Sequence, residues 1–193
     1  MRPVRSAAVA SPQDLTLRVA GIVAGSMLMA LGAHVAVPVP WSPVPVTCQT
    51  LALPLVVALL GARGAAISLV LYLGEGVAGL PVFAPVADGA IGIARLLGPS
   101  AGYLVAFPVA AYAIGLLFDA GFWRTFFGRA AAIALGSAIV LACGAGWLAH
   151  YVGAERAFAL GIAPFLIGDV LKTLVAASIA PWVRAGGLFA KLR

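Results

Sequence analysis

The chain has 193 residues, of which 63% are hydrophobic and 9% are charged, whereas an ordinary soluble domain has about 25% charged residues. Its 12 Lys and Arg and 6 Asp and Glu side chains are too few to cover a water-soluble fold, so lipid must surround most of the molecule. This composition excludes a soluble globular protein and predicts an all-α integral membrane protein. The net charge of +6 does not indicate nucleic-acid binding, because the basic residues are scattered between long apolar runs.

The chain begins with a polar segment, and apolar sequence starts at Val19. No short apolar region with a small-residue cleavage site is present, so we expect the first apolar segment to stay in the membrane rather than to be removed as a signal peptide. The run from Val19 to Ala62 is uncharged and too long for one helix. The prolines of VPVPWSPVPV break it, because proline does not fit a helix interior. We predict spans at about 18–37 and 47–61 with an extended loop between them.

Four further apolar segments complete a single predicted six-helix membrane domain over residues 1–193. They lie at about 65–80, 102–118, 130–151 and 164–183. Arg63 and Gly64 mark the turn before the first of these segments, and a loop rich in Gly and Pro follows it. Pro164 suits the first turn of the last helix.

The distribution of positive charge predicts the orientation, because cytoplasmic loops carry an excess of Lys and Arg. With six spans and a cytoplasmic N-terminus, most of the 12 basic residues fall on the cytoplasmic side. These are Arg2, Arg5, Arg18, Arg63, Arg124, Arg129, Arg184, Lys191 and Arg193. We therefore expect both termini in the cytoplasm, with Arg95, Arg156 and Lys172 as the remaining basic residues.

Two ionisable residues lie inside the last predicted span. In PFLIGDVLKTLV, Asp169 and Lys172 are three residues apart, which places them on one face of a helix. An ionisable side chain inside a membrane is costly and is therefore a candidate functional residue. The alternative is a self-neutralising pair that only holds helices together. We favour a ligand site, because the pair lies in the outer part of the span, where Lys172 cannot easily reach the cytoplasmic surface.

Further polar side chains are predicted on the same outer side. Arg95 precedes the fourth span, and Thr47 and Gln49 begin the second. Two cations and one carboxylate suit an anionic ligand that also has a hydrogen-bonding group, such as an amide or a urea. Taken singly, Arg95 would also fit a contact with lipid headgroups, and Thr47 and Gln49 would fit helix caps.

Aromatic residues are the candidates for the wall of such a pocket, namely Trp41, Phe83 and Tyr103. Anchoring at the membrane interface is the alternative for each of them. Glu75 lies within or at the edge of the third predicted span and is a candidate partner for Arg95.

Metal and ATP sites are not indicated. His34 and His150 have no carboxylate or cysteine at ligand spacing, and Cys48 and Cys143 lie far apart in apolar sequence. The phosphate-binding motif GxxxxGK[ST] and the motifs HExxH and GxSxG are missing from the sequence. We therefore expect no enzyme activity, no metal and no cofactor. If the chain moves a solute uphill with ATP, another protein must hydrolyse the ATP.

Four ordered segments match a known family. They are PVPWSPVPVTCQTLALPL, LYLGEGVAGLPVFAP, LLGPSAGYLVAF and PFLIGDVLKTLVAA, and the match covers about residues 15–185. In this order and spacing they resemble the BioY family, the biotin-binding S components of energy-coupling factor (ECF) transporters. The resemblance implies a six-helix S-component fold in the bacterial cytoplasmic (inner) membrane and a biotin pocket closed from outside by loops. It also implies a transmembrane coupling protein and two cytoplasmic ATPases as partners.

The resemblance also implies roles for single residues. Asp169 and Lys172 match the biotin-contacting Asp and Lys of the family's last-helix motif, and Arg95 matches an arginine before its GPTGGYL-like motif. Ser26 and Ala30 on the first span resemble the small-residue surface by which S components dock on the coupling protein. The sequence departs from the common pattern at Cys48, Glu75, Ser100 and Ala101.

The function we expect is capture of biotin from outside and its delivery across the membrane by an ATP-driven ECF module. The biotin carboxylate is expected at Lys172 or Arg95, and the ureido group at Asp169, Gln49 or Thr47. The sequence leaves this assignment open.

Four alternatives also stay open. The chain would be an S component for another vitamin, such as thiamin or riboflavin, or a solitary biotin transporter that works as a homo-oligomer. A membrane-embedded hydrolase or transferase would use Asp169, Lys172 and a histidine, although the missing nucleophile motifs argue against it. A membrane scaffold would bind no saturable ligand.

Overall fold

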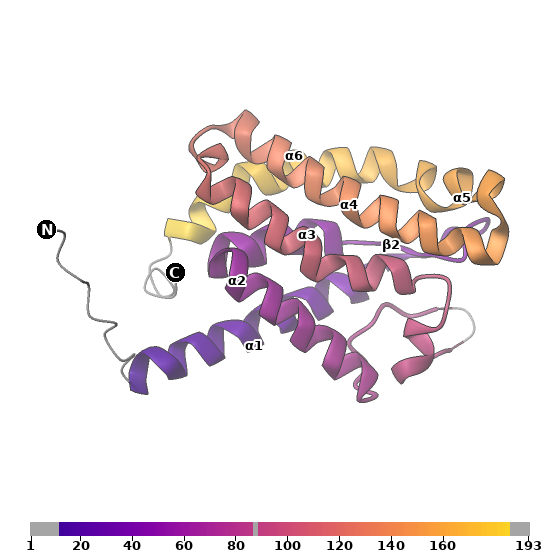
Figure 1. Cartoon of the computed structure of the whole chain (residues 1–193), viewed down its shortest axis with the longest axis horizontal. Coiled ribbons are helices and arrows are strands. Elements are labelled where there is room, and N and C mark those ends of the chain that lie inside the picture. The colour runs from indigo at the N-terminus through magenta and orange to yellow at the C-terminus, as the bar shows by residue number, and fades with distance from the viewer. Residues whose placement is uncertain (1–11, 87–88, 186–193) are drawn as a thin grey trace, which may run out of the picture.

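The structure is a computed structural model that describes residues 12–86 and 89–185. Figure 1 shows long helices side by side, with short elements at one end. In chain order the elements are α1 (Pro12–His34), β1 (Ala36–Val37), β2 (Val46–Thr47), α2 (Gln49–Val77), η1 (Gly92–Leu96), α3 (Ala101–Asp119), η2 (Phe122–Arg124), α4 (Phe126–Val152), α5 (Ala154–Gly161) and α6 (Ala163–Ala185). The predicted all-helical class is confirmed, and the proline-rich loop adds one antiparallel pair of two-residue strands.

Five helical segments of the described chain are long and apolar enough to cross a membrane. They are α1, α2, α3, α4 and the segment Ala154–Arg184, which joins α5 and α6. Large apolar side chains such as Val109, Ile167 and Leu171 are exposed on the outside of these helices, as expected where lipid replaces water. Fully buried side chains such as Met29, Leu53, Leu69, Ile114, Ile133 and Leu148 form the core between them.

Helix α2 folds back on itself at Gly61, where φ is 71° and ψ is −178°. Only glycine adopts this left-handed φ without strain. The side chains of Gln49 and Tyr72 are joined by a hydrogen bond of 2.9 Å across 23 positions of sequence. In a straight helix these residues would lie about 35 Å apart, so α2 must be a hairpin of two arms. The turn predicted at Arg63 and Gly64 therefore lies slightly earlier, at Gly61.

The two arms of α2 lie at the centre of the molecule and contact α1, α3 and α6, while α4 packs against α3, α5 and α6. Close helix crossings depend on small residues. A Cβ atom at Gly115 on α3 would overlap the backbone of Ala62 at the α2 bend, and one at Gly144 on α4 would overlap the Tyr103 ring. Thr125 is the N-cap of helix α4, and its hydroxyl accepts a hydrogen bond of 3.0 Å from the Gly128 amide.

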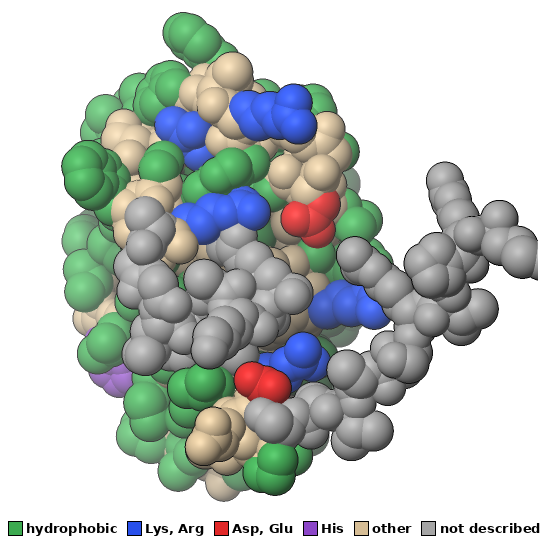
Figure 2. Space-filling model, turned by 90° about the vertical axis from the view of Figure 1, so that its left-hand side faces the viewer, with side chains coloured by type: hydrophobic (Ala, Val, Ile, Leu, Met, Phe, Trp, Pro, Cys, Tyr) green, Lys and Arg blue, Asp and Glu red, His purple; other side chains and the backbone are tan. Residues whose placement is uncertain are grey.

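The start of α1, the bend of α2 and the end of α6 lie together at one end of the helix bundle (Figure 1). Figure 2 views this end and shows Lys and Arg side chains gathered on it with few acidic ones. We call it the basic end. The β1–β2 loop, η1 and α5 lie at the other end. The predicted cytoplasmic residues Arg2, Arg5, Lys191 and Arg193 lie outside the described residues.

Candidate functional site

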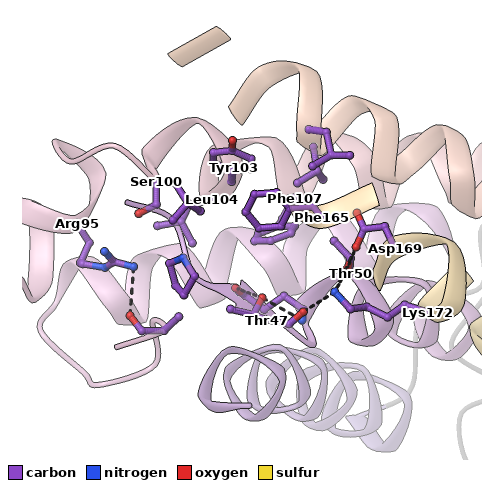
Figure 3. Close-up of a pocket in the computed structure, with 16 residues that line it drawn as sticks. Thr47, Thr50, Arg95, Ser100, Tyr103, Leu104, Phe107, Phe165, Asp169 and Lys172 are labelled. Carbon is purple, nitrogen blue, oxygen red and sulfur yellow. Dashed lines mark hydrogen bonds and ion pairs between the residues drawn. The ribbon is translucent and has the colours of Figure 1, made fainter. Parts of the chain in front are cut away.

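A cavity lies between α2, α3, α4 and α6, and the β1–β2 loop forms part of its wall through Val44 and Pro45. Figure 3 shows two groups of polar side chains on opposite sides of this cavity, with apolar side chains between them. Thr50, Asp169 and Lys172 form one group, and Arg95 and Ser100 form the other.

The first group is a hydrogen-bonded cluster around Lys172. Its ammonium group donates to the Thr47 carbonyl at 2.7 Å, to the Thr50 hydroxyl at 3.1 Å and to Asp169 Oδ1 at 3.2 Å. The Thr50 hydroxyl in turn donates to Asp169 Oδ1 at 2.7 Å. An ammonium group has three donor hydrogens, so the protein already occupies all the donors of Lys172. These interactions fix the Lys172 ammonium group beside the buried Asp169 carboxyl group.

The second carboxylate oxygen of Asp169 differs from the first in its hydrogen bonding. Oδ2 is buried and has no hydrogen-bond partner among the described residues. A buried carboxylate oxygen without a partner costs free energy, because it has lost its water and gained nothing in return. It is therefore a ready acceptor for an N–H group of a ligand in the cavity, which Asp169 lines.

Gln49 and Thr47 form a second polar unit at the start of α2. The Gln49 amide donates to the Tyr72 hydroxyl at 2.9 Å and accepts from the Thr47 hydroxyl at 3.1 Å. These bonds orient the Gln49 side chain at the cavity and fasten the two arms of α2 together. Thr47 therefore serves the site twice, through its hydroxyl and through the carbonyl that binds Lys172.

On the opposite side of the cavity, Arg95 is a buried cation. Its guanidinium Nη2 donates to the Ala84 carbonyl at 3.1 Å, which ties η1 to the loop after α2. Ser100 lies at the start of α3, and its buried hydroxyl has no hydrogen-bond partner within the described chain. A guanidinium and a hydroxyl at a cavity wall are suited to bind a carboxylate.

Between the polar groups the wall is apolar and aromatic. Tyr103, Phe107 and Phe165 line the cavity together with Leu104 and Val140. The Tyr103 hydroxyl is fastened to the Gly161 carbonyl at 2.7 Å, and its ring centroid lies 5.9 Å from that of Phe165. This wall is suited to an apolar ring or chain.

The free volume of the cavity is about 50 Å³. Sites for small organic ligands are usually larger, about 300 Å³ or more. The side chains and the β1–β2 loop are therefore packed into the space that a ligand would fill. The loop is held over the cavity by Ser42, whose hydroxyl donates to the Leu160 carbonyl at 2.7 Å.

Six of the seven substrate-binding candidates from the sequence line this one cavity, namely Thr47, Gln49, Arg95, Tyr103, Asp169 and Lys172. The seventh, Trp41, is 67% exposed on the β1–β2 loop and does not line the cavity. Phe83 packs behind the cavity against Tyr72, with ring centroids 5.3 Å apart. Thr50 and Ser100 also line the cavity but were not among the candidates from the sequence, because neither carries a charge.

Two expectations need correction, one for the docking surface on the first helix and one for the partner of Glu75. Ser26 is completely buried between α1 and α2, so it does not lie on a surface where another chain can dock, and Ala30 is partly buried against the core. The Ser26 hydroxyl donates to Glu75 Oε1 at 3.1 Å. Glu75 therefore has Ser26 as its observed partner in place of the Arg95 that we expected.

No group of His, Cys, Asp and Glu able to hold a metal ion occurs in residues 12–86 and 89–185. Together, the long apolar helices and the partly open cavity with polar groups at its two ends are typical of a membrane-spanning protein with a candidate binding site for a small amphipathic molecule.

Comparisons with known proteins narrow this class. The model of the BioY family matches residues 5–187, so the chain belongs to the BioY family. A probable biotin transporter of Pyrococcus horikoshii is 35% identical over 153 residues, which cover 79% of this chain and 87% of that protein. The biotin transporter BioY of Thermotoga maritima is also 35% identical, over 79% of this chain and 87% of its own length.

A solved structure agrees with this fold. It is a crystal structure of the S component for biotin from an ECF-type ABC transporter, with a TM-score of 0.83. The match covers 96% of this chain and 100% of that chain at 24% sequence identity. At this level of identity the match shows that the two chains share a fold.

Proposed function

We propose that this chain is a biotin-specific S component, which captures biotin in the cavity between α2, α3 and α6 and delivers it across the membrane. The relatives named as biotin transporters support this ligand. The single observation that carries the proposal is the pairing of a free, buried acceptor at Asp169 with a cation at Arg95 across one amphipathic cavity. Biotin has a ureido ring with N–H donors at one end, an acid at the other and an apolar body between them.

The hydrogen bonds favour one orientation of the ligand. Since every donor of Lys172 is already taken by the protein, Lys172 acts as a positioning residue for Asp169 rather than as the partner of the carboxylate. Asp169 Oδ2 accepts a ureido N–H, and the biotin acid reaches the guanidinium of Arg95 and the hydroxyl of Ser100. Tyr103, Phe107 and Phe165 contact the apolar part.

Biotin must enter from the end that carries the β1–β2 loop, because this loop lines the cavity. The cavity is smaller than the ligand, so the loop and the side chains beneath it must move outward during entry. Breaking the bond between Ser42 and Leu160 is one step of this opening.

The topology we propose has six passes, with the two arms of α2 counted separately and both termini in the cytoplasm. It is supported by the α2 hairpin and by the basic end, which carries the excess of Arg expected on the cytoplasmic side. The membrane is the bacterial cytoplasmic membrane.

The energy for uptake is proposed to come from an ECF module, with a transmembrane coupling protein and two cytoplasmic ATPases. Ser26 is buried and cannot contact the coupling protein. We therefore assign the docking surface for the coupling protein to the exposed face of α1 that carries Ala20, Ala24 and Met27. Ala20 and Ala24 are four residues apart and allow a partner helix to approach closely.

Binding of radiolabelled biotin to the purified full-length chain tests the proposal. We expect saturable binding that unlabelled biotin displaces and that an excess of thiamin or riboflavin leaves unchanged. Displacement by thiamin or riboflavin would assign the site to another vitamin, and absence of saturable binding would refute it. Biotin uptake by cells that lack every ECF module would show that the chain transports biotin alone and would refute the coupling.

A further inference from the structure

A second cavity lies at the basic end, far from the biotin site. Its volume is about 640 Å³, and it is bounded by the start of α1, the bend of α2, the end of α3 and the end of α6. The bend at Gly61 shapes it, because it separates the two arms of α2 beside Gly115 of α3. Nothing in the biotin-binding function uses this space.

Three arginines from three different elements line this second cavity. They are Arg18 on α1, Arg63 after the bend of α2 and Arg184 near the end of α6. One acidic residue, Asp119, also lines it, so the charged lining has a formal charge of +2. This local excess of positive charge favours an anionic ligand.

The three arginines differ in what holds them. The guanidinium of Arg184 lies over the ring of Trp123, 4.3 Å from its centroid, which fixes it near the cavity. Arg18 and Arg63 are exposed, and within residues 12–86 and 89–185 neither forms an ion pair. Their donors are available to the oxygens of a phosphate group, which guanidinium binds in a bidentate manner.

The apolar part of the wall of this second cavity indicates that the anionic group is attached to a hydrocarbon chain. Ile22, Ile67 and Leu116 line it together with Tyr112. Ile67 and Leu116 are about half exposed and belong to the outer surface that faces lipid. The cavity is therefore cationic at the end of the bundle and apolar along its side, which suits a molecule with a phosphate group and a hydrocarbon chain.

We propose that this second cavity binds an anionic glycerophospholipid of the surrounding leaflet. The phosphate group contacts Arg18, Arg63 and Arg184, and an acyl chain runs along Ile67 and Leu116. A bound lipid would join α1, α2, α3 and α6 at this end of the bundle.

The test is titration of phosphatidylglycerol and of phosphatidylcholine against the purified full chain, with bound lipid counted by native mass spectrometry. A basic residue near an anionic lipid contributes about fivefold in affinity, so Arg18→Gln with Arg63→Gln should weaken phosphatidylglycerol binding about 25-fold. Arg124→Gln is the matched control, because Arg124 is exposed in η2 but does not line the cavity. The control should bind as the unchanged chain does.

Two further variants distinguish a phospholipid from a soluble phosphate compound and control for misfolding. Ile67→Trp fills the apolar wall and should weaken phosphatidylglycerol without weakening glycerol phosphate. Arg18→Lys with Arg63→Lys keeps the charge and should retain most of the lipid. Biotin binding is measured in parallel for both variants and should be unchanged in every variant that folds.

Three results would overturn the proposal. Equal binding of the two lipids would show that charge is not recognised. Displacement of phosphatidylglycerol by an equal concentration of glycerol phosphate would assign the cavity to a soluble anion. If the Arg18→Gln, Arg63→Gln variant keeps the lipid but no longer assembles with the coupling protein, the arginines serve a protein contact instead.

Discussion

At the scale of single residues, the site depends on one buried ion pair whose members have unequal roles. Lys172 uses its donors within the protein, whereas Asp169 keeps one oxygen free towards the cavity. Breaking a buried pair by removing one partner is costly, because the other charge remains without compensation. The two residues should therefore respond differently to substitution.

Asp169→Asn should weaken biotin binding about 10- to 100-fold, because a hydrogen bond to a charged group contributes about 1.5–3 kcal/mol. Isothermal titration with biotin measures the effect. Asp119→Asn is the control, since Asp119 lies at the basic end of the molecule and should leave binding unchanged. An unaltered affinity of the Asp169→Asn variant would contradict the role of Oδ2.

Lys172→Gln should also weaken binding, but through Asp169. In the Asp169→Asn background the same substitution should cost much less, since no buried charge is left unpaired. A double-mutant cycle on the dissociation constant of biotin measures this coupling. Additive effects of the two substitutions would mean that Lys172 contacts biotin directly.

The sequence predicted most of this site, because an ionisable residue in an apolar span has few explanations. Asp169 and Lys172 were found in this way, whereas Arg95 was found because the predicted topology places it on the outer side; all three line the cavity. Thr50 and Ser100 were not found, since a hydroxyl in a membrane protein often bonds to its own helix and so carries little information. Trp41 was placed at the site by its residue type, but it lies on the surface of the loop.

At the scale of elements, the proposed function depends on the β1–β2 loop over the cavity and on the bend of α2. The sequence predicts a turn at Arg63 and Gly64 but does not show that the residue in the left-handed conformation is Gly61. Of Gly61 and Gly64, only Gly61 has a positive φ. The short helix α5 was not predicted, because it lies in the connection between the predicted spans 130–151 and 164–183.

Gly61→Ala should lower the melting temperature of the protein, since a left-handed residue with a Cβ costs about 1–2 kcal/mol. Thermal unfolding in detergent measures the change. Gly146→Ala on α4 is the control, because a Cβ there meets nothing within 4 Å and alanine favours a helix. Equal melting temperatures for the two variants would contradict the structure at the bend.

Ser42→Ala should release the β1–β2 loop from Leu160 and speed the dissociation of biotin about fivefold, as expected from loss of one hydrogen bond of about 1 kcal/mol. Stopped-flow displacement of a fluorescent biotin analogue measures the rate. Ser178→Ala, on the exposed side of α6, serves as the comparison. A dissociation rate that does not change would show that the loop is not held by this bond.

At the scale of the whole molecule, the two ends of the helix bundle differ in charge, and this difference supports the proposed orientation. The basic end carries Arg18, Arg63 and Arg184, and the other end carries the β1–β2 loop over the proposed biotin site. The sequence predicted this separation from the distribution of charge alone. It did not predict the second cavity, because its arginines come from segments far apart in the chain.

The orientation can be measured with single cysteines placed at the two ends, after Cys48 and Cys143 have been replaced by alanine. A maleimide that cannot cross the membrane should label Glu155→Cys on α5 in intact cells but not Arg124→Cys in η2. Permeabilised cells, in which both should react, provide the control. The reverse pattern in intact cells would contradict the proposed topology.

The most direct test of the account combines a change in the ligand with a change in the cavity. Biotin and its uncharged amide, biotinamide, are titrated against the unchanged chain and against Arg95→Gln. We expect the unchanged chain to bind biotin about tenfold more tightly than biotinamide, since a charged hydrogen bond contributes about 1.5 kcal/mol, and the Arg95→Gln variant to bind both alike. If the unchanged chain does not bind biotin, or if Arg95→Gln keeps the full preference for the acid, the assignment of this cavity is wrong.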